Sequence, residues 1–228
     1  MNGLRVTEND LRKRYADPLL TTLTLLLILL MFIVAPLQID RGVGATEVGA
    51  AIALVMIGGV RLLTRGLLPP LLMVAAVCMN ALVILHRLHG RPSLEDLYLS
   101  ALAWIILTGT LGWVVARSVF GPGQINYHRI IGSILLYLLI AMAFASLYLL
   151  IGLRVPNAFA NLTFEDSPAL TSALIYFSCV TLTTVGYGDI TPVYPLARSL
   201  SNLEAIVGQL YPAILIGRLV TLQLERRD

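Results

Sequence analysis

The sequence predicts an all-α membrane protein with six transmembrane helices and one re-entrant segment between the last two. Of the 228 residues, 57% are hydrophobic and only 13% are charged, and the mean hydropathy is +0.84. Ordinary soluble domains carry about 25% charged residues. The chain also contains several charge-free runs close to the length of about 20 residues that a membrane-spanning helix needs. These observations argue against a soluble monomer.

The basic residues flank the apolar runs and do not form a stripe. The net charge of +3 and the pI near 9.0 therefore report orientation in a membrane. We expect membrane lipids as partners and no nucleic acid. Cys78 and Cys179 both lie inside apolar runs, which argues against a disulfide framework or a metal site.

Intervals without Asp, Glu, Lys or Arg define the first four spans, which form a predicted four-helix domain over 18–116. A cytoplasmic segment, 1–17, precedes it. The second interval is short, so its span is expected to end at Glu47 and Arg61, with Arg61 reaching toward the lipid headgroups. The four expected spans are 18–39, 48–60, 66–86 and 97–116.

A second unit follows a linker that contains a Gly-Pro-Gly sequence and so cannot form one continuous helix. The expected parts are the linker 117–129, the fifth span 130–153, the sixth span 195–220 and a cytoplasmic tail 221–228.

The distribution of Lys and Arg predicts that both termini are cytoplasmic, because cytoplasmic loops are enriched in basic residues. An even number of spans agrees with this orientation, and the cell membrane is the expected location. The cytoplasmic side would then hold Arg5, Arg12, Lys13, Arg14, Arg61, Arg65, Arg117, Arg129, Arg218, Arg226 and Arg227.

The interval 167–188 is also free of charge and long enough to count as a seventh span. However, it ends in Thr-Thr-Val-Gly-Tyr-Gly at 183–188 and is followed by Asp189. A continuous spanning helix does not readily hold two glycines, β-branched residues and an acid. Non-helical backbone occurs at membrane depth where it is buried in protein or lines a water-filled path. We therefore predict a short helix followed by an extended re-entrant strand.

The run 178–189 resembles the pore helix and selectivity filter of tetrameric potassium channels. The resemblance implies a homotetramer whose pore domain is 130–220, with K⁺ as the permeant ion and no organic cofactor. It also implies that backbone carbonyls replace the hydration shell of K⁺ and that the Thr184 hydroxyl adds the innermost oxygens. Gly186 and Gly188 would supply the positive φ that such a backbone needs. The expected ion-binding residues are Thr184, Val185, Gly186, Tyr187 and Gly188.

The residues around the filter depart from the family pattern. The family usually has a pair of Trp residues on the pore helix, and here Tyr176 and Phe177 stand at those places. We expect the Tyr176 hydroxyl to bond to Asp189 and Phe177 to pack against Tyr187. Val180 stands where some members have a Glu that pairs with the acid after the filter, so that carboxyl pair is absent.

Glu204 lies well inside the predicted sixth span, where an acid is costly and usually faces a cavity or a partner. One hypothesis is that it points behind the filter and ties the inner helix to the pore helix through Thr181 or Thr183. The alternative is that four carboxylates line the cavity and attract cations. Four like charges around one axis would repel one another, which favours the first hypothesis.

Gly208 falls where the family commonly has a hinge glycine, and Pro212 removes a backbone donor one turn later. This pair predicts a kink in the last helix and a possible gating hinge. Close helix packing at Gly208 is the alternative, because small residues serve that purpose in membranes.

The fourth span contains no basic residue, whereas voltage-gated relatives carry a series of arginines there. Each charge moved through the membrane field contributes about 2.3 kcal/mol per 100 mV. The four-helix domain thus resembles a voltage sensor in topology only. Steep voltage gating is not expected, and coupling between the domain and the pore would run through helix contacts.

Three functions agree with these observations. The first is a passive K⁺ channel; the second is a membrane subunit of a coupled K⁺ uptake system, although such systems usually repeat degenerate filters within one chain. The third is a non-conducting scaffold with a vestigial filter. No catalytic constellation of Ser, His and Asp, metal ligands or phosphate-binding residues supports an enzyme. The sequence indicates neither the gating stimulus nor a regulatory partner.

Overall fold

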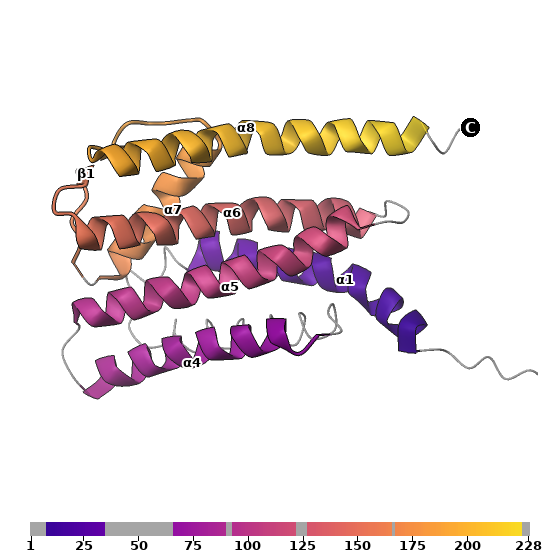
Figure 1. The fold of residues 1–228 in the computed structure, drawn as a ribbon, viewed down its shortest axis with the longest axis horizontal. Coiled ribbons are helices and arrows are strands. Elements are labelled where there is room, and N and C mark those ends of the chain that lie inside the picture. The colour runs from indigo at the N-terminus through magenta and orange to yellow at the C-terminus, as the bar shows by residue number, and fades with distance from the viewer. Residues whose placement is uncertain (1–7, 35–65, 90–92, 122–126, 166, 225–228) are drawn as a thin grey trace, which may run out of the picture.

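The structure, a computed structural model, describes residues 8–34, 66–89, 93–121, 127–165 and 167–224. Helices dominate these residues, and Figure 1 shows how they are arranged; among the same residues there are two strands of two residues each. The elements are α1 (Glu8–Leu29), the π-helix η1 (Leu30–Val34), α4 (Leu68–His89), α5 (Leu94–Phe120), α6 (Tyr127–Arg154), β1 (Phe159–Ala160), α7 (Pro168–Leu182), β2 (Thr191–Pro192) and α8 (Pro195–Leu224).

Helices α5 and α6 enclose the predicted spans 97–116 and 130–153, and α4 begins two residues inside the predicted span 66–86 and runs three residues past its end. Within the described residues these three helices are long and apolar enough to cross a membrane, so the chain is a multi-pass membrane protein. Helix α8 extends to Leu224, four residues beyond the predicted end. The predicted second span, 48–60, lies outside the described residues.

The first helix differs from its prediction. Helix α1 begins at Glu8, inside the predicted cytoplasmic segment 1–17, and continues through Pro18. Its apolar part within the described residues is Pro18–Ile33, and the end of the predicted span, 35–39, lies outside them. Intervals without charged residues do not include the part of the helix before Pro18, because that part contains charged residues. Lys, Arg and Glu are nevertheless good helix formers.

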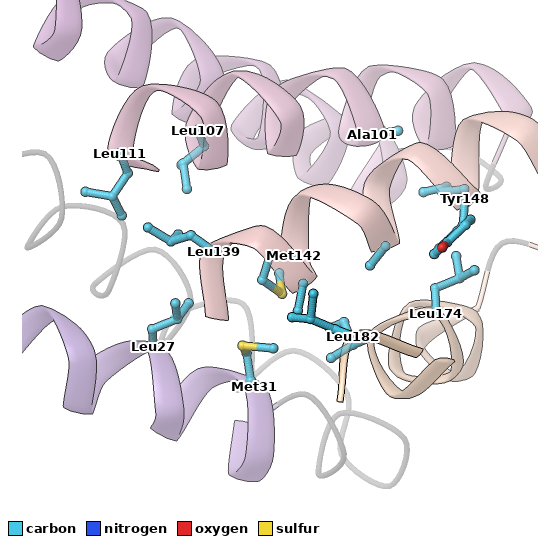
Figure 2. Close-up of a cluster of buried hydrophobic side chains, with 14 of the residues drawn as sticks. Leu27, Met31, Ala101, Leu107, Leu111, Leu139, Met142, Tyr148, Leu174 and Leu182 are labelled. Atoms are coloured by element: carbon cyan, nitrogen blue, oxygen red, sulfur yellow. The ribbon is translucent and has the colours of Figure 1, made fainter. Parts of the chain in front are cut away.

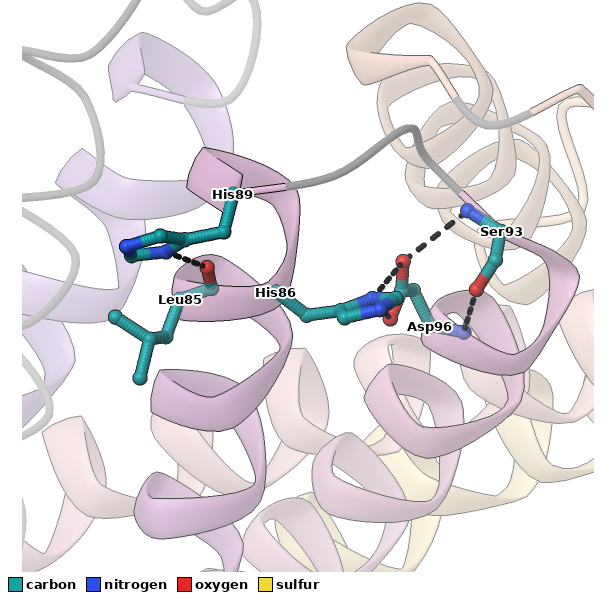
Figure 3. Close-up of polar contacts among 5 residues, drawn as sticks. All are labelled: Leu85, His86, His89, Ser93 and Asp96. Atoms are coloured by element: carbon teal, nitrogen blue, oxygen red, sulfur yellow. Dashed lines mark hydrogen bonds and ion pairs between the residues drawn. The ribbon is translucent and has the colours of Figure 1, made fainter.

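Helix α5 begins at a capping box. The Ser93 side chain accepts a hydrogen bond from the Asp96 N–H at 3.3 Å, and the Asp96 carboxylate accepts one from the Ser93 N–H at 3.1 Å. His86, in the last turn of α4, contacts the same carboxylate with its Nδ1 at 2.9 Å (Figure 3). The cap satisfies helix-end donors, and the histidine ties the end of α4 to the start of α5.

Helix α6 is central, because it packs against α1, α5, α7 and α8. Figure 2 shows part of the buried cluster around it, where Leu139 and Met142 of α6 meet side chains from α1 and α5. Leu182, at the end of α7, belongs to the same cluster. Helices α1, α5 and α6 and the end of α7 therefore share one core.

Candidate functional site

The segment between β1 and β2 leaves and re-enters the fold at one end. Phe159 pairs with Pro192 and Ala160 with Thr191 in an antiparallel ladder. Helix α7 begins at the cap residue Ser167, whose side chain accepts from the Leu170 N–H at 3.3 Å. It is only 15 residues long, and the chain returns without a second helix before β2. This is the short helix and extended strand that the sequence predicted.

The φ angles of the backbone that follows α7 alternate in sign. Thr184, Gly186 and Gly188 have φ values of 59°, 55° and 80°, whereas Val185 and Tyr187 between them do not have positive φ. A β-carbon on Gly186 or Gly188 would meet no atom within 4 Å, so glycine is required there by φ and not by space. Thr184 adopts the same region despite its branched side chain, which marks local strain.

The N–H groups at the inner end of this strand bond back to the end of α7. The Val180 carbonyl accepts from Val185 N–H at 2.9 Å and from Gly186 N–H at 3.1 Å, and the Thr181 carbonyl accepts from Thr184 N–H at 2.9 Å. Within the described residues, the carbonyls of 184–187 accept no hydrogen bond. These three N–H donors are thus engaged behind the strand, while the carbonyls of 184–187 stay free to accept from or coordinate a ligand.

Tyr176, and not Phe177, meets Tyr187. The rings of Tyr176 and Tyr187 stack with centroids 6.3 Å apart and planes 3° apart. The hydrogen bond predicted between the Tyr176 hydroxyl and Asp189 stays a prediction. The prediction for Phe177 was wrong: its ring is buried against Tyr148, with centroids 4.9 Å apart. Successive helix residues point about 100° apart, so only one of the two aromatic rings can face the filter strand.

Glu204 is fully buried between three helices. The Tyr148 hydroxyl of α6 donates to its Oε2 at 2.6 Å, and the Ser178 hydroxyl of α7 donates to its Oε1. The predicted partners were wrong, because the hydroxyls of Thr181 and Thr183 bond to carbonyls of their own helix. Burial within one chain also argues against a carboxylate that lines a cavity.

The close packing at Gly208 determines which residue of α7 contacts Glu204. A β-carbon on Gly208 would overlap the Leu182 carbonyl, so α8 approaches the end of α7 at backbone distance there. One turn earlier on each helix, this contact brings Glu204 beside Ser178. The packing role proposed as the alternative for Gly208 thus has a specific contact.

The predicted kink is not evident. Helix α8 is one continuous helix that includes Pro212, and its ribbon runs without an evident break in the view of Figure 1. The gating hinge stays a prediction.

Two amide side chains contact the filter strand without having been predicted. The Gln209 amide donates to the Thr184 hydroxyl at 2.8 Å, and the Asn161 amide donates to the Asp189 carbonyl at 2.9 Å. Asn161 lies in an Asn-Leu-Thr pattern typical of glycosylation, which is frequent by chance. No feature of the sequence singled out Gln209, because one glutamine in a helix points to no particular function.

Comparisons with known proteins point to the same region. Residues 133–224, from α6 through α8, match the family described as ion channel. The chain is 33% identical over 87 residues to Protein LctB of Bacillus caldotenax, covering 37% of this chain and 64% of that protein. It is 38% identical over 79 residues to the inward rectifier potassium channel Kirbac3.1 of Paramagnetospirillum magnetotacticum, covering 35% and 24%.

A plant relative adds a third match. Identity to the two pore potassium channel c of Oryza sativa subsp. japonica is 34% over 90 residues, covering 39% of this chain and 20% of that protein. The chain thus spans less than two thirds of the length of each of these relatives. The family match covers the C-terminal part of the chain, residues 133–224.

Proposed function

We propose that this protein is a potassium-selective channel that passes K⁺ passively through the backbone carbonyls of residues 184–187. One observation carries the proposal: φ alternates in sign along this strand while its carbonyls accept no hydrogen bond within the described residues. Carbonyl rings of this kind replace the hydration shell of K⁺. Two of the matched relatives are named as potassium channels, which supports the choice of ion.

The proposed channel is a homotetramer. One strand supplies one carbonyl at each level, so a closed ring of oxygens requires several copies around an axis, and the resemblance implies four. Exposed apolar side chains on α8, among them Ile206, Leu210 and Ile214, support such an assembly. The C-terminal end of α7, the negative end of the helix dipole, lies directly before Thr184 and favours a cation there.

Six spans with both termini in the cytoplasm and weak voltage dependence complete the proposal. The part of α5 between its first and last turns carries no basic residue, and Arg117 lies in the last turn. A gating charge would have to lie within the field, so α5 offers none at that depth.

Reconstitution of the purified full chain in liposomes with a K⁺ gradient tests the function. The expected result is a passive flux, with single-channel currents that reverse near the K⁺ potential and discriminate against Na⁺. Gly186→Ala should abolish it because of the positive φ, whereas Gly109→Ala should not: a β-carbon there meets nothing within 4 Å and the position is helical. Absence of flux would favour the scaffold, and flux that needs an energy source would favour the uptake subunit.

Ion binding can be measured without conduction. A ligand that binds only the assembled state stabilises it, so K⁺ should raise the melting temperature of the tetramer and Na⁺ should do so far less. Equal effects of the two ions would contradict a selective filter.

A further inference from the structure

The inner end of the filter strand has a side-chain contact from another helix. Gln209 of α8 donates from Nε2 to the Thr184 Oγ1 at 2.8 Å. The residue before it, Gly208, brings the α8 backbone against the Leu182 carbonyl, so the origin of this side chain is fixed by packing. Gln209 is exposed in the single chain, and it stands apart from the buried hydrogen bonds of Glu204.

We propose that Gln209 is a positioning residue that fixes the Thr184 hydroxyl and thereby sets how firmly the innermost cation position holds its ion. This inference rests on the proposed function, since it assigns a role within the same filter. A threonine hydroxyl has one proton and two lone pairs. The Gln209 N–H occupies one lone pair, which leaves the other available to a cation and stops free rotation of the hydroxyl.

Two features of the contact favour a role in ion binding over a role in folding. First, the hydrogen bond is exposed within one chain, and such a bond between neutral groups adds little net stability. Second, its acceptor belongs to the residue with strained φ at the inner end of the strand. Oxygens that are already oriented bind an ion without the cost of ordering them.

Barium is a suitable probe because it is a divalent cation close to K⁺ in size and responds more strongly to the placement of oxygen ligands. We would measure the concentration of Ba²⁺, added on the cytoplasmic side, that halves the K⁺ flux through the reconstituted full chain. Gln209→Met keeps a flexible unbranched chain of similar length but removes the donor. The expected result is an increase in the half-blocking concentration of roughly tenfold.

A matched control and a second variant make the result specific. Asn202→Ser changes an exposed amide two turns earlier on the same helix and should shift Ba²⁺ block by less than about twofold. Gln209→Leu replaces Gln209→Met if that variant does not assemble. Thr184→Val removes the acceptor at nearly constant shape, and adding Gln209→Met to it should produce no further change in K⁺-dependent or Ba²⁺-dependent thermal stabilisation.

The outcomes separate this inference from the function on which it rests. Suppose that the wild type conducts K⁺ but that the half-blocking Ba²⁺ concentration of Gln209→Met equals that of the wild type, or differs from it no more than that of Asn202→Ser does. The role of Gln209 is then refuted, and the proposed channel function stands. Additive effects of Gln209→Met and Thr184→Val would also refute it. A wild type with neither K⁺ flux nor stabilisation by K⁺ would remove the proposed function, and the inference with it.

Discussion

The Tyr148 hydroxyl donates a 2.6 Å hydrogen bond to Oε2 of Glu204, and both side chains are fully buried. Together with Ser178 on the other carboxylate oxygen, this contact joins the three helices α6, α7 and α8. Polar groups buried without partners are costly, so the Glu204 carboxylate depends on both hydroxyls, whereas the Ser178 hydroxyl also contacts the Ala141 carbonyl at 2.7 Å. The contact between these helices therefore contains a polar connection within an apolar core.

Tyr148→Phe should destabilise the protein. The change keeps the aromatic contacts with Phe177 and Phe159 but leaves Oε2 of Glu204 without its donor. An unsatisfied buried acceptor costs about 1–3 kcal/mol. Thermal unfolding of the purified protein measures the effect, with Tyr127→Phe as the control because that tyrosine of α6 is 73% exposed. Equal melting temperatures for the two variants would show that the Tyr148–Glu204 bond is dispensable.

Gly208→Ala should loosen the contact between α7 and α8. Its β-carbon would overlap the Leu182 carbonyl, and a backbone atom cannot move aside as a flexible side chain can. Forced overpacking of this kind typically costs about 1–3 kcal/mol. Gly217→Ala on the same helix is the control, since a β-carbon there meets nothing within 4 Å. A Gly208→Ala protein with normal stability but reduced opening would instead favour the hinge.

Asn161→Ala should weaken the outer end of the filter strand. The Asn161 amide anchors the Asp189 carbonyl from the loop after β1, and this loop sits beside the ladder of β1 and β2. Without the anchor, we expect a higher K⁺ concentration to be needed for half-maximal thermal stabilisation, by roughly two- to tenfold for one lost hydrogen bond. Asn161 and Asn157 both have positive φ, 60° and 58°. Asn157→Ala therefore controls for the effect of placing alanine at such a backbone position. An unchanged K⁺ dependence would count against the anchor.

Phe120→Leu should alter gating more than stability. Arg218 of α8 donates to the Phe120 carbonyl at 2.9 Å, and its guanidinium lies 4.9 Å from the centre of the Phe120 ring. The substitution removes the cation–π contact, worth about 0.5–1 kcal/mol at an exposed site, and keeps the backbone acceptor. Open probability in single-channel recordings is the readout, compared with Trp113→Leu, which removes the ring under Arg117 within α5. If both variants gate like the wild type, this contact between α5 and α8 does not couple the two parts.

Local chemistry made the filter strand predictable from sequence. Alternating φ depends on glycine at every second place, so Gly186 and Gly188 reveal the backbone before any fold is known. The apolar helices α4, α5 and α6 were equally predictable, because the length of an apolar run is a property of the chain alone. Glu204 could be recognised as unusual for the same reason, since an acid in an apolar helix needs a partner wherever it lies.

The partners of these residues depended on how the helices pack. Ser178 and Tyr148 meet Glu204 because the approach of Gly208 to Leu182 sets the register of α8 against α7. Gln209 and Asn161 are ordinary amides in sequence and gain meaning only where the fold places them against Thr184 and Asp189. Composition and spacing indicate what each residue is able to do. A hydrogen bond between residues 25 or more apart in the sequence forms only because helix contacts bring the two groups within reach.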